Sequence, residues 1–107
     1  MLLINEFDDL NVTLDYSNQF TIAKFPKDFE NAEDFASEAV YRLIPYLDEK
    51  AVIVAISKNS KVVVLSNSSK YRKWLQRHFH KPSIGIAQFF DDVEPELIIE
   101  KLKEFYK

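Results

Sequence analysis

Adjacent carboxylates are the residues of this chain whose type and spacing best suit chemistry. Asp8-Asp9 lies near the beginning of the sequence and Asp91-Asp92 near its end. Two such pairs brought together by the fold can bind Mg²⁺ through oxygen, or act as a general acid and base. Neighbouring side chains diverge on any regular element, so each pair supplies one useful ligand rather than two. We therefore expect no metal site.

The two histidines and the nucleophilic side chains give no stronger case for catalysis. His78 and His80 are two residues apart, and on a helix that spacing directs them roughly 200° from each other, which prevents a shared metal ion. The chain has no cysteine and one glycine, Gly85, which excludes thiolate chemistry and glycine-rich phosphate loops. No serine lies in a strand–turn–helix elbow flanked by glycines. We predict a protein that is not an enzyme and binds no cofactor.

A basic stretch, "SKYRKWLQRHFHKPS" at 69–83, carries five fixed positive charges and no carboxylate. Helical spacing predicts one apolar face that packs on the core, formed by Tyr71, Trp74, Leu75 and Phe79, with His78 partly buried beside it. A nucleic-acid site would use the cations of the other face, which are Lys70, Arg72, Lys73 and Arg77. Aromatic rings buried in the core cannot stack on bases, and the chain has a net charge of −3 and a pI near 5.4. Nucleic acid is therefore the less favoured partner.

Charge is segregated along the chain. Residues 1–60 hold eleven carboxylates and five Lys or Arg, residues 61–90 hold six Lys or Arg and no acid, and residues 91–107 hold six acids and three lysines. The acids cluster beside phenylalanines in "FDDL", "DFENAED" and "FFDDVEPE". Carboxylates beside aromatic anchors suit a cationic protein partner that is attracted by long-range electrostatics.

These clusters define the predicted partner-binding residues: Asp8, Asp9, Asp28, Phe29, Glu30, Glu33, Asp34, Tyr41, Asp91 and Asp92. In size, charge and lack of a catalytic constellation, the chain is similar in kind to bacterial immunity proteins and antitoxins, small inhibitors that neutralise a basic toxin such as a nuclease. We therefore predict a protein-binding inhibitor of a cationic partner. The alternatives are a nucleic-acid-binding accessory domain that uses the basic helix 69–81, and a small subunit or homodimer that pairs through an exposed strand edge.

Size and composition predict one domain, residues 1–107, with an ordered core, since 47% of the residues are apolar and 14% aromatic. No run approaches the roughly 20 apolar residues that span a bilayer, and "MLLINEFDDL" lacks a basic leader. The absence of cysteine suits a reducing compartment. We expect a cytoplasmic protein without membrane contact.

Hydrophobic spacing predicts the elements that position these residues. Two alternating runs, 11–16 and 19–25, predict a hairpin, and the β-branched runs 51–57 and 61–66 around the turn "KNSK" predict a second hairpin at the centre of the sheet. Residues 83–90 predict a fifth strand.

Three segments show the helical period instead. One begins after Asn31, its predicted N-cap, and ends near Leu43 or Ile44 because Pro45 follows; the others lie within 69–81 and 94–107. The predicted fold is α+β, a single domain with a mostly antiparallel sheet of about five strands and three helices in the order ββαββαβα.

Overall fold

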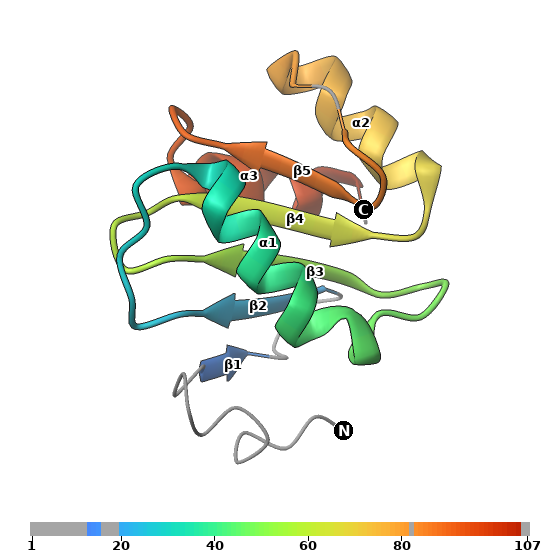
Figure 1. The fold of residues 1–107 in the computed structure, drawn as a ribbon. Coiled ribbons are helices and arrows are strands. Elements are labelled where there is room, and N and C mark those ends of the chain that lie inside the picture. The colour runs from blue at the N-terminus through green and yellow to red at the C-terminus, as the bar shows by residue number, and fades with distance from the viewer. Residues whose placement is uncertain (1–12, 16–19, 82, 106–107) are drawn as a thin grey trace.

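A computed structural model describes residues 13–15, 20–81 and 83–105 of the chain. Its sheet has the strand order β1-β2-β3-β4-β5 (Figure 1). The strands are β1 (Thr13–Asp15), β2 (Thr21–Lys24), β3 (Val52–Ile56), β4 (Val62–Ser66) and β5 (Ala87–Phe90). The helices are α1 (Ala32–Leu43), α2 (Ser69–Phe79) and α3 (Pro95–Phe105), with a short 3₁₀ helix, η2 (Ile44–Tyr46), directly after α1.

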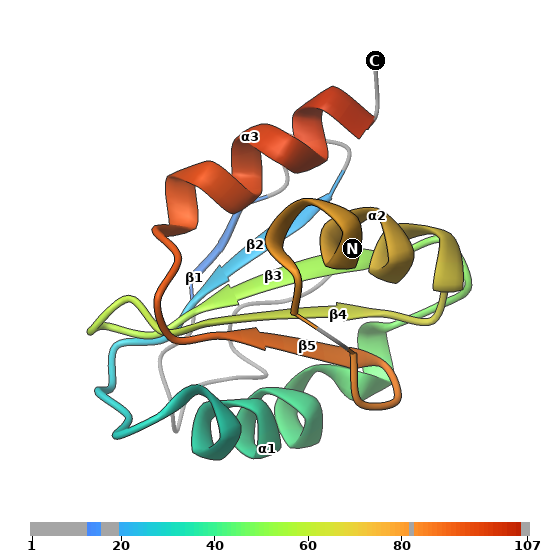
Figure 2. The ribbon, with the colours of Figure 1, turned by 90° about the horizontal axis from the view of Figure 1, so that it is seen from above.

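The helices cover both faces of the sheet. Figure 2 shows α1 on one side and α2 and α3 on the other. Successive residues of a strand point to opposite faces, so Ile53 and Leu65 pack with α1 in one core, while Val54 and Val64 pack with α2 and α3 in the second. Almost every residue of β3 and β4 is buried, as expected for the β-branched runs. The α+β class and the central hairpin are therefore confirmed.

The sheet is mixed, which corrects the prediction of a mostly antiparallel sheet. β2 and β3 run parallel, whereas β1–β2, β3–β4 and β4–β5 are antiparallel. The cause is α1, because a helix that crosses over the face of the sheet returns the chain to the edge from which β2 began. Four strands of four or five residues form the body of the sheet, and β1 adds three residues at its margin. The order of elements along the chain also differs from the predicted order, because η2 is an additional element between α1 and β3.

Local signals set the two ends of α1. The Asn31 side chain accepts a hydrogen bond from the Asp34 backbone N–H at 2.8 Å, which makes Asn31 the N-cap that the sequence predicts. At the other end, α1 stops at Leu43 and Pro45 lies in η2, since a proline cannot donate to the preceding helical turn. Each boundary of α1 is therefore set by residues within a few positions of that boundary.

The aromatic face of α2 packs against α3 and the sheet, as predicted. Leu75 is fully buried, and Trp74 is half-buried, with its indole N–H donating to the Lys101 carbonyl at 3.2 Å. The Trp74 ring also lies 5.3 Å from the ring of Phe105. The prediction for His78 is wrong: this side chain is exposed and touches the edge of Trp74, 4.4 Å between ring centroids, at the margin of the interface.

Candidate functional site

Three strands of the sheet end at the same edge. β2, β3 and β5 run in one direction, so the loops 25–31 and 91–94 lie there together with the turn 57–61 that joins β3 to β4 (left in Figure 1). Helices α1 and α3 begin at this edge. The loops and the first turns of these helices carry eight exposed carboxylates, which we call the acidic edge: Asp28, Glu30, Glu33, Asp34, Asp91, Asp92, Glu94 and Glu96.

Asp91 joins the two acidic segments. Its carboxylate accepts a hydrogen bond from the Ala32 backbone N–H at 2.8 Å, across 59 residues of sequence. The same carboxylate oxygen lies 3.6 Å from the Lys61 ammonium. A carboxylate is favoured at a helix N-terminus by the unpaired N–H groups and by the helix dipole. Asp91 therefore fastens the beginning of α1 to the end of β5, and its first role is structural.

Asp92, the next residue, is paired with a cation from beyond the edge. The Lys81 ammonium lies 3.1 Å from the Asp92 carboxylate. The hydrogen bond from Lys81 and its positive charge lower the pKa of Asp92 below its ordinary value. Asp92 therefore stays ionised under all but strongly acidic conditions.

The other six carboxylates of the acidic edge have no hydrogen-bond or ion-pair partner among the described residues. The edge also carries cations, namely Lys24, Lys27, Lys58 and Lys61, so eight negative charges face four positive ones. Of these lysines, Lys61 is paired with Asp91, and Lys27 lies 5.3 Å from the ring centroid of Phe29. The edge is therefore negative on balance, and most of its carboxylates are free to meet a ligand.

A network of hydrogen bonds holds the loop before α1 in place. Asn59, in the turn after β3, accepts from the Phe29 N–H at 3.1 Å and donates to the Phe29 carbonyl at 2.6 Å. The Asn59 amide oxygen also accepts from the Ser57 hydroxyl at 2.7 Å. The sequence does not indicate this role of Asn59, since "KNSK" predicts a turn but not the distant loop that its asparagine binds.

The two predicted aromatic anchors lie in different environments. Phe29 is half-buried, and its ring packs on Phe35 with 4.8 Å between centroids, so it supports the loop rather than projecting from it. Tyr41 is 74% exposed, but it belongs to the last turns of α1, away from the acidic edge. The structure thus brings together Asp28, Glu30, Glu33, Asp34, Asp91 and Asp92 and separates Tyr41 from them. Asp8 and Asp9 lie outside the described residues.

The basic residues of α2 are only partly available to a ligand. The Arg72 guanidinium donates to the Ser66 carbonyl, and the Lys70 ammonium lies 5.4 Å from the ring centroid of Phe105. Lys73 and Arg77 remain exposed, and with Gln76 and His80 they line an open hollow of about 710 Å³. A polyanion would therefore meet two free cations here, without an aromatic platform beside them.

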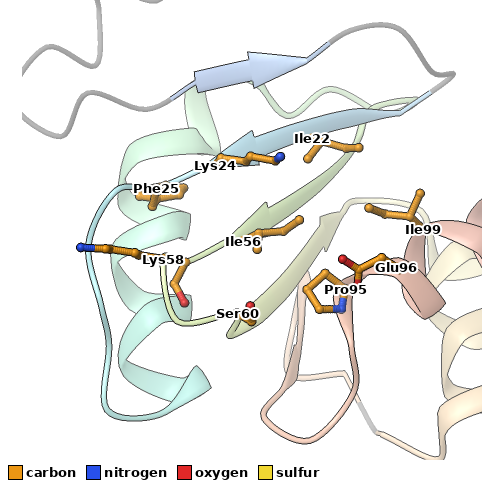
Figure 3. Close-up of a pocket in the computed structure, with 10 residues that line it drawn as sticks. Ile22, Lys24, Phe25, Ile56, Lys58, Ser60, Pro95, Glu96 and Ile99 are labelled. Carbon is orange, nitrogen blue, oxygen red and sulfur yellow. The ribbon is translucent and has the colours of Figure 1, made fainter.

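A second hollow, of about 390 Å³, opens between the sheet and the beginning of α3 (Figure 3). Its apolar lining includes Ile22, Ile56 and Ile99, and Figure 3 shows the Lys24 and Glu96 side chains directed toward it from opposite sides. Lys58 also lines this hollow, but its ammonium points away. This depression beside the acidic edge combines isoleucines with polar side chains, and its isoleucines can contact an apolar side chain of a partner.

Neither a metal cluster nor a membrane span is present in the part of the chain that the structure describes: no three His, Asp or Glu side chains there are grouped to hold an ion, and no helix is long and apolar enough to cross a bilayer.

No protein-family model matches the chain, and no curated protein or solved structure matches it significantly.

Proposed function

We propose that this protein is a binding module that neutralises a cationic protein partner, an inhibitor of the immunity-protein or antitoxin kind, and that the acidic edge contacts that partner. It acts by covering the partner and performs no reaction of its own. The observation that carries the proposal is the convergence of two acidic segments, 28–34 and 91–96, through the 2.8 Å hydrogen bond between Ala32 and Asp91.

Helix stability alone does not account for the acidic edge. Carboxylates in the first turn of a helix are stabilised by its dipole, and this explains Glu33, Asp34 and Glu96. Asp28 and Glu30 lie in the loop before α1, outside any helical turn. Like charges crowded on one surface repel each other and destabilise the folded protein. A partner that supplies positive charge offsets this repulsion between the carboxylates.

A surface of this kind suits rapid association. Partly unpaired carboxylates on several loops produce a negative potential that attracts a cationic protein before contact and orients it. Exposed charges of this sort govern the association rate and its salt dependence more than the final affinity. In the hollow beside the edge, Ile22, Ile56 and Ile99 add an apolar contact of the type that limits dissociation.

Affinity capture with matched charge variants tests the proposal. The edge-neutralised variant carries Glu30→Gln, Glu33→Gln and Asp34→Asn. The control-neutralised variant carries three changes at exposed glutamates elsewhere, Glu49→Gln, Glu100→Gln and Glu104→Gln, the last of which also removes a 3.1 Å ion pair with Lys101. Both variants lose three negative charges. Captured proteins from cells that produce the chain are quantified by mass spectrometry.

We expect the wild-type protein and the control-neutralised variant to retain one basic protein in salt-sensitive fashion. At a partner concentration below the dissociation constant, the edge-neutralised variant should retain about a tenth as much, because slower association alone weakens the affinity and a tenfold change corresponds to about 1.4 kcal/mol. Equal recovery by both variants, or recovery of no basic protein by the wild-type chain, contradicts the proposal.

Nucleic-acid binding through α2 is the second candidate, because Lys73 and Arg77 are exposed and free of ion pairs among the described residues. Trp74 opposes it, since its indole is bonded to Lys101 and packed on Phe105 rather than open to a base. Fluorescence anisotropy with a labelled 20-nucleotide RNA and a DNA of equal length, at ~150 mM salt, separates the candidates. Binding that Lys73→Ala and Arg77→Ala abolish supports nucleic acid instead of a cationic protein.

A further inference from the structure

A groove runs between α1 and the outer strand β5 on the α1 face of the sheet. It has a volume of about 530 Å³ and is lined by Ala36, Val40 and Tyr41 of α1, by Ile84, Ala87 and Phe89, and by Glu33 and Ser37. Tyr41 and Ile84 are 74% and 65% exposed, and because both line the groove they form one exposed apolar patch. The groove extends from these two residues to Glu33 at the acidic edge.

Among the described residues, the backbone of Phe89 has no partner on the outer side of β5, beside this groove. Residues of an antiparallel strand alternate between bonding to one neighbour and facing the other way. Ser66 donates to the Ile86 carbonyl at 3.0 Å, whereas Ala87 exchanges hydrogen bonds with Ile84, at 2.8 and 3.1 Å, on the side away from β4. The backbone N–H and C=O of Phe89, two residues later, face the same outer side as those of Ala87. No described residue pairs with Phe89 there, since β5 is the last strand of the sheet.

The dimensions suit an extended peptide. From Glu33 to Tyr41, α1 advances by eight residues, or about 12 Å, which is the length of roughly four residues of extended chain. A strand added beside Phe89 directs alternate side chains toward α1, where Ala36 and Val40 lie. Ile84 already occupies the outer side of Ala87, so an added strand begins beyond Ile84 and continues toward the acidic edge.

Charge indicates what kind of peptide enters. The groove is lined by one carboxylate, Glu33, and by no cation, and Glu33 has no ion-pair partner among the described residues. Asp34 follows Glu33 in the same turn, and Asp91 directly follows β5. A peptide leaving the groove at this end therefore meets negative charge.

We infer that the α1–β5 groove receives an extended segment of the partner, which adds as a strand to β5, places alternate apolar side chains against α1, and carries lysine or arginine where it reaches Glu33. This inference rests on the proposed function, because it specifies how the cationic partner is held. Backbone hydrogen bonds to a sheet edge supply affinity, and the alternate side chains supply specificity.

A library of random 12-residue peptides displayed on phage is the probe. Peptides selected on the full chain are synthesised, and their affinities are measured by fluorescence anisotropy. Backbone amide hydrogen exchange is followed by NMR with and without the peptide. Three single variants accompany the wild type: Tyr41→Asp and Ile84→Asp in the groove, and Leu97→Asp as the control, since Leu97 is a 50% exposed apolar residue on the far side of the sheet.

We expect the selected peptides to alternate apolar residues and to end in arginine or lysine. The Phe89 amide should exchange at least tenfold more slowly in the complex, whereas Gln88 and Phe90, already paired with β4, should change little. Tyr41→Asp and Ile84→Asp should each weaken binding at least tenfold, and Leu97→Asp less than twofold. Unchanged Phe89 exchange, equal affinities of all three variants, or no enriched peptide overturns the inference.

Two further outcomes separate the inference from the proposed function. Basic peptides that lose affinity for the edge-neutralised variant but leave Phe89 exchange unchanged overturn the groove and support the acidic edge. Peptides that slow Phe89 exchange, carry no positive charge and bind the edge-neutralised variant as tightly as the wild type overturn the cationic partner and support the groove. A dimer in sedimentation that Ile84→Asp dissociates assigns the groove to a second copy of this chain and overturns the inference.

Discussion

Replacing Asp91 with alanine tests the contact that assembles the acidic edge. The substitution removes the acceptor of the Ala32 N–H, 2.8 Å away, and the ion pair with Lys61 at 3.6 Å. Without it, the first N–H of α1 has no protein partner at that position, and β5 and α1 are no longer joined at this edge. Asp91→Asn keeps a side-chain acceptor but removes the charge.

The expected cost follows from the geometry. A hydrogen bond to a charged acceptor contributes about 1.5–3 kcal/mol, and the Asp91 side chain is 52% exposed, so water replaces part of the lost bond. An exposed ion pair adds ~0–1 kcal/mol. We therefore expect Asp91→Ala to reduce the free energy of unfolding by about 1.5 kcal/mol, near the lower end of the range. Asp91→Asn should cost about 0.5 kcal/mol, the usual scale of a helix-dipole interaction.

Urea denaturation followed by circular dichroism at 222 nm measures these differences. Asp28→Ala is the control, because Asp28 is an exposed carboxylate of the same edge without a partner among the described residues, and it should lie within about 0.5 kcal/mol of the wild type. The slope of the unfolding free energy against urea should be the same for all variants. If Asp91→Ala is no less stable than Asp28→Ala, Asp91 does not fasten α1 to β5 and the reasoning fails.

Three further predictions follow from single contacts. Asn59→Ala removes both hydrogen bonds to the Phe29 backbone and should cost about 1–2 kcal/mol, with faster proteolysis within residues 25–31; unchanged proteolysis would contradict this. Trp74→Phe removes the donor to the Lys101 carbonyl and should cost about 1 kcal/mol in urea denaturation; equal stability would show that the bond contributes nothing. Lys81→Met should raise the pKa of Asp92 toward its ordinary value, measured by NMR titration with Lys101→Met as the control, and no rise would exclude Lys81 as the cause.

The Asp92 pair also predicts a direction for stability against pH. The pKa of Asp92 is lowered in the folded protein, chiefly by the hydrogen bond and charge of Lys81. The unfolded state therefore binds the proton more readily, so the contribution of Asp92 is fully present above its unfolded pKa of about 4. It is lost as the pH falls through the lower folded value. Lys81→Met should remove this acid-dependent part of the stability curve.

Local features of the fold could be predicted from the sequence. The N-cap Asn31 and its hydrogen-bond donor Asp34 are only three residues apart in the sequence. The end of α1 depends on the nearby Pro45. The β-branched runs of β3 and β4 indicate burial on both faces because few other environments accommodate such runs. The buried Leu75 and half-buried Trp74 follow from the 3.6-residue period of α2.

Features that depend on distant segments could not be predicted. The parallel relation of β2 and β3 depends on the path of α1 over the sheet, and alternating side chains do not encode strand direction. The bond from Ala32 to Asp91 spans 59 residues, so the sequence shows two acidic segments without showing that they meet. The groove beside Phe89 likewise exists only because β5 is the outer strand. Because of this arrangement, the exposed side chain of Tyr41 on α1 lines the groove beside β5.

The association rate of the captured partner, measured by surface plasmon resonance against salt concentration, tests the acidic edge most directly. The wild-type chain and the control-neutralised variant should associate at least tenfold more slowly at 500 mM than at about 50 mM salt, because added salt shortens the Debye length and screens the attraction. The edge-neutralised variant should be slow at low salt and nearly insensitive to it. A rate that salt leaves unchanged, or one that falls only when Lys73 and Arg77 are replaced, would contradict the account.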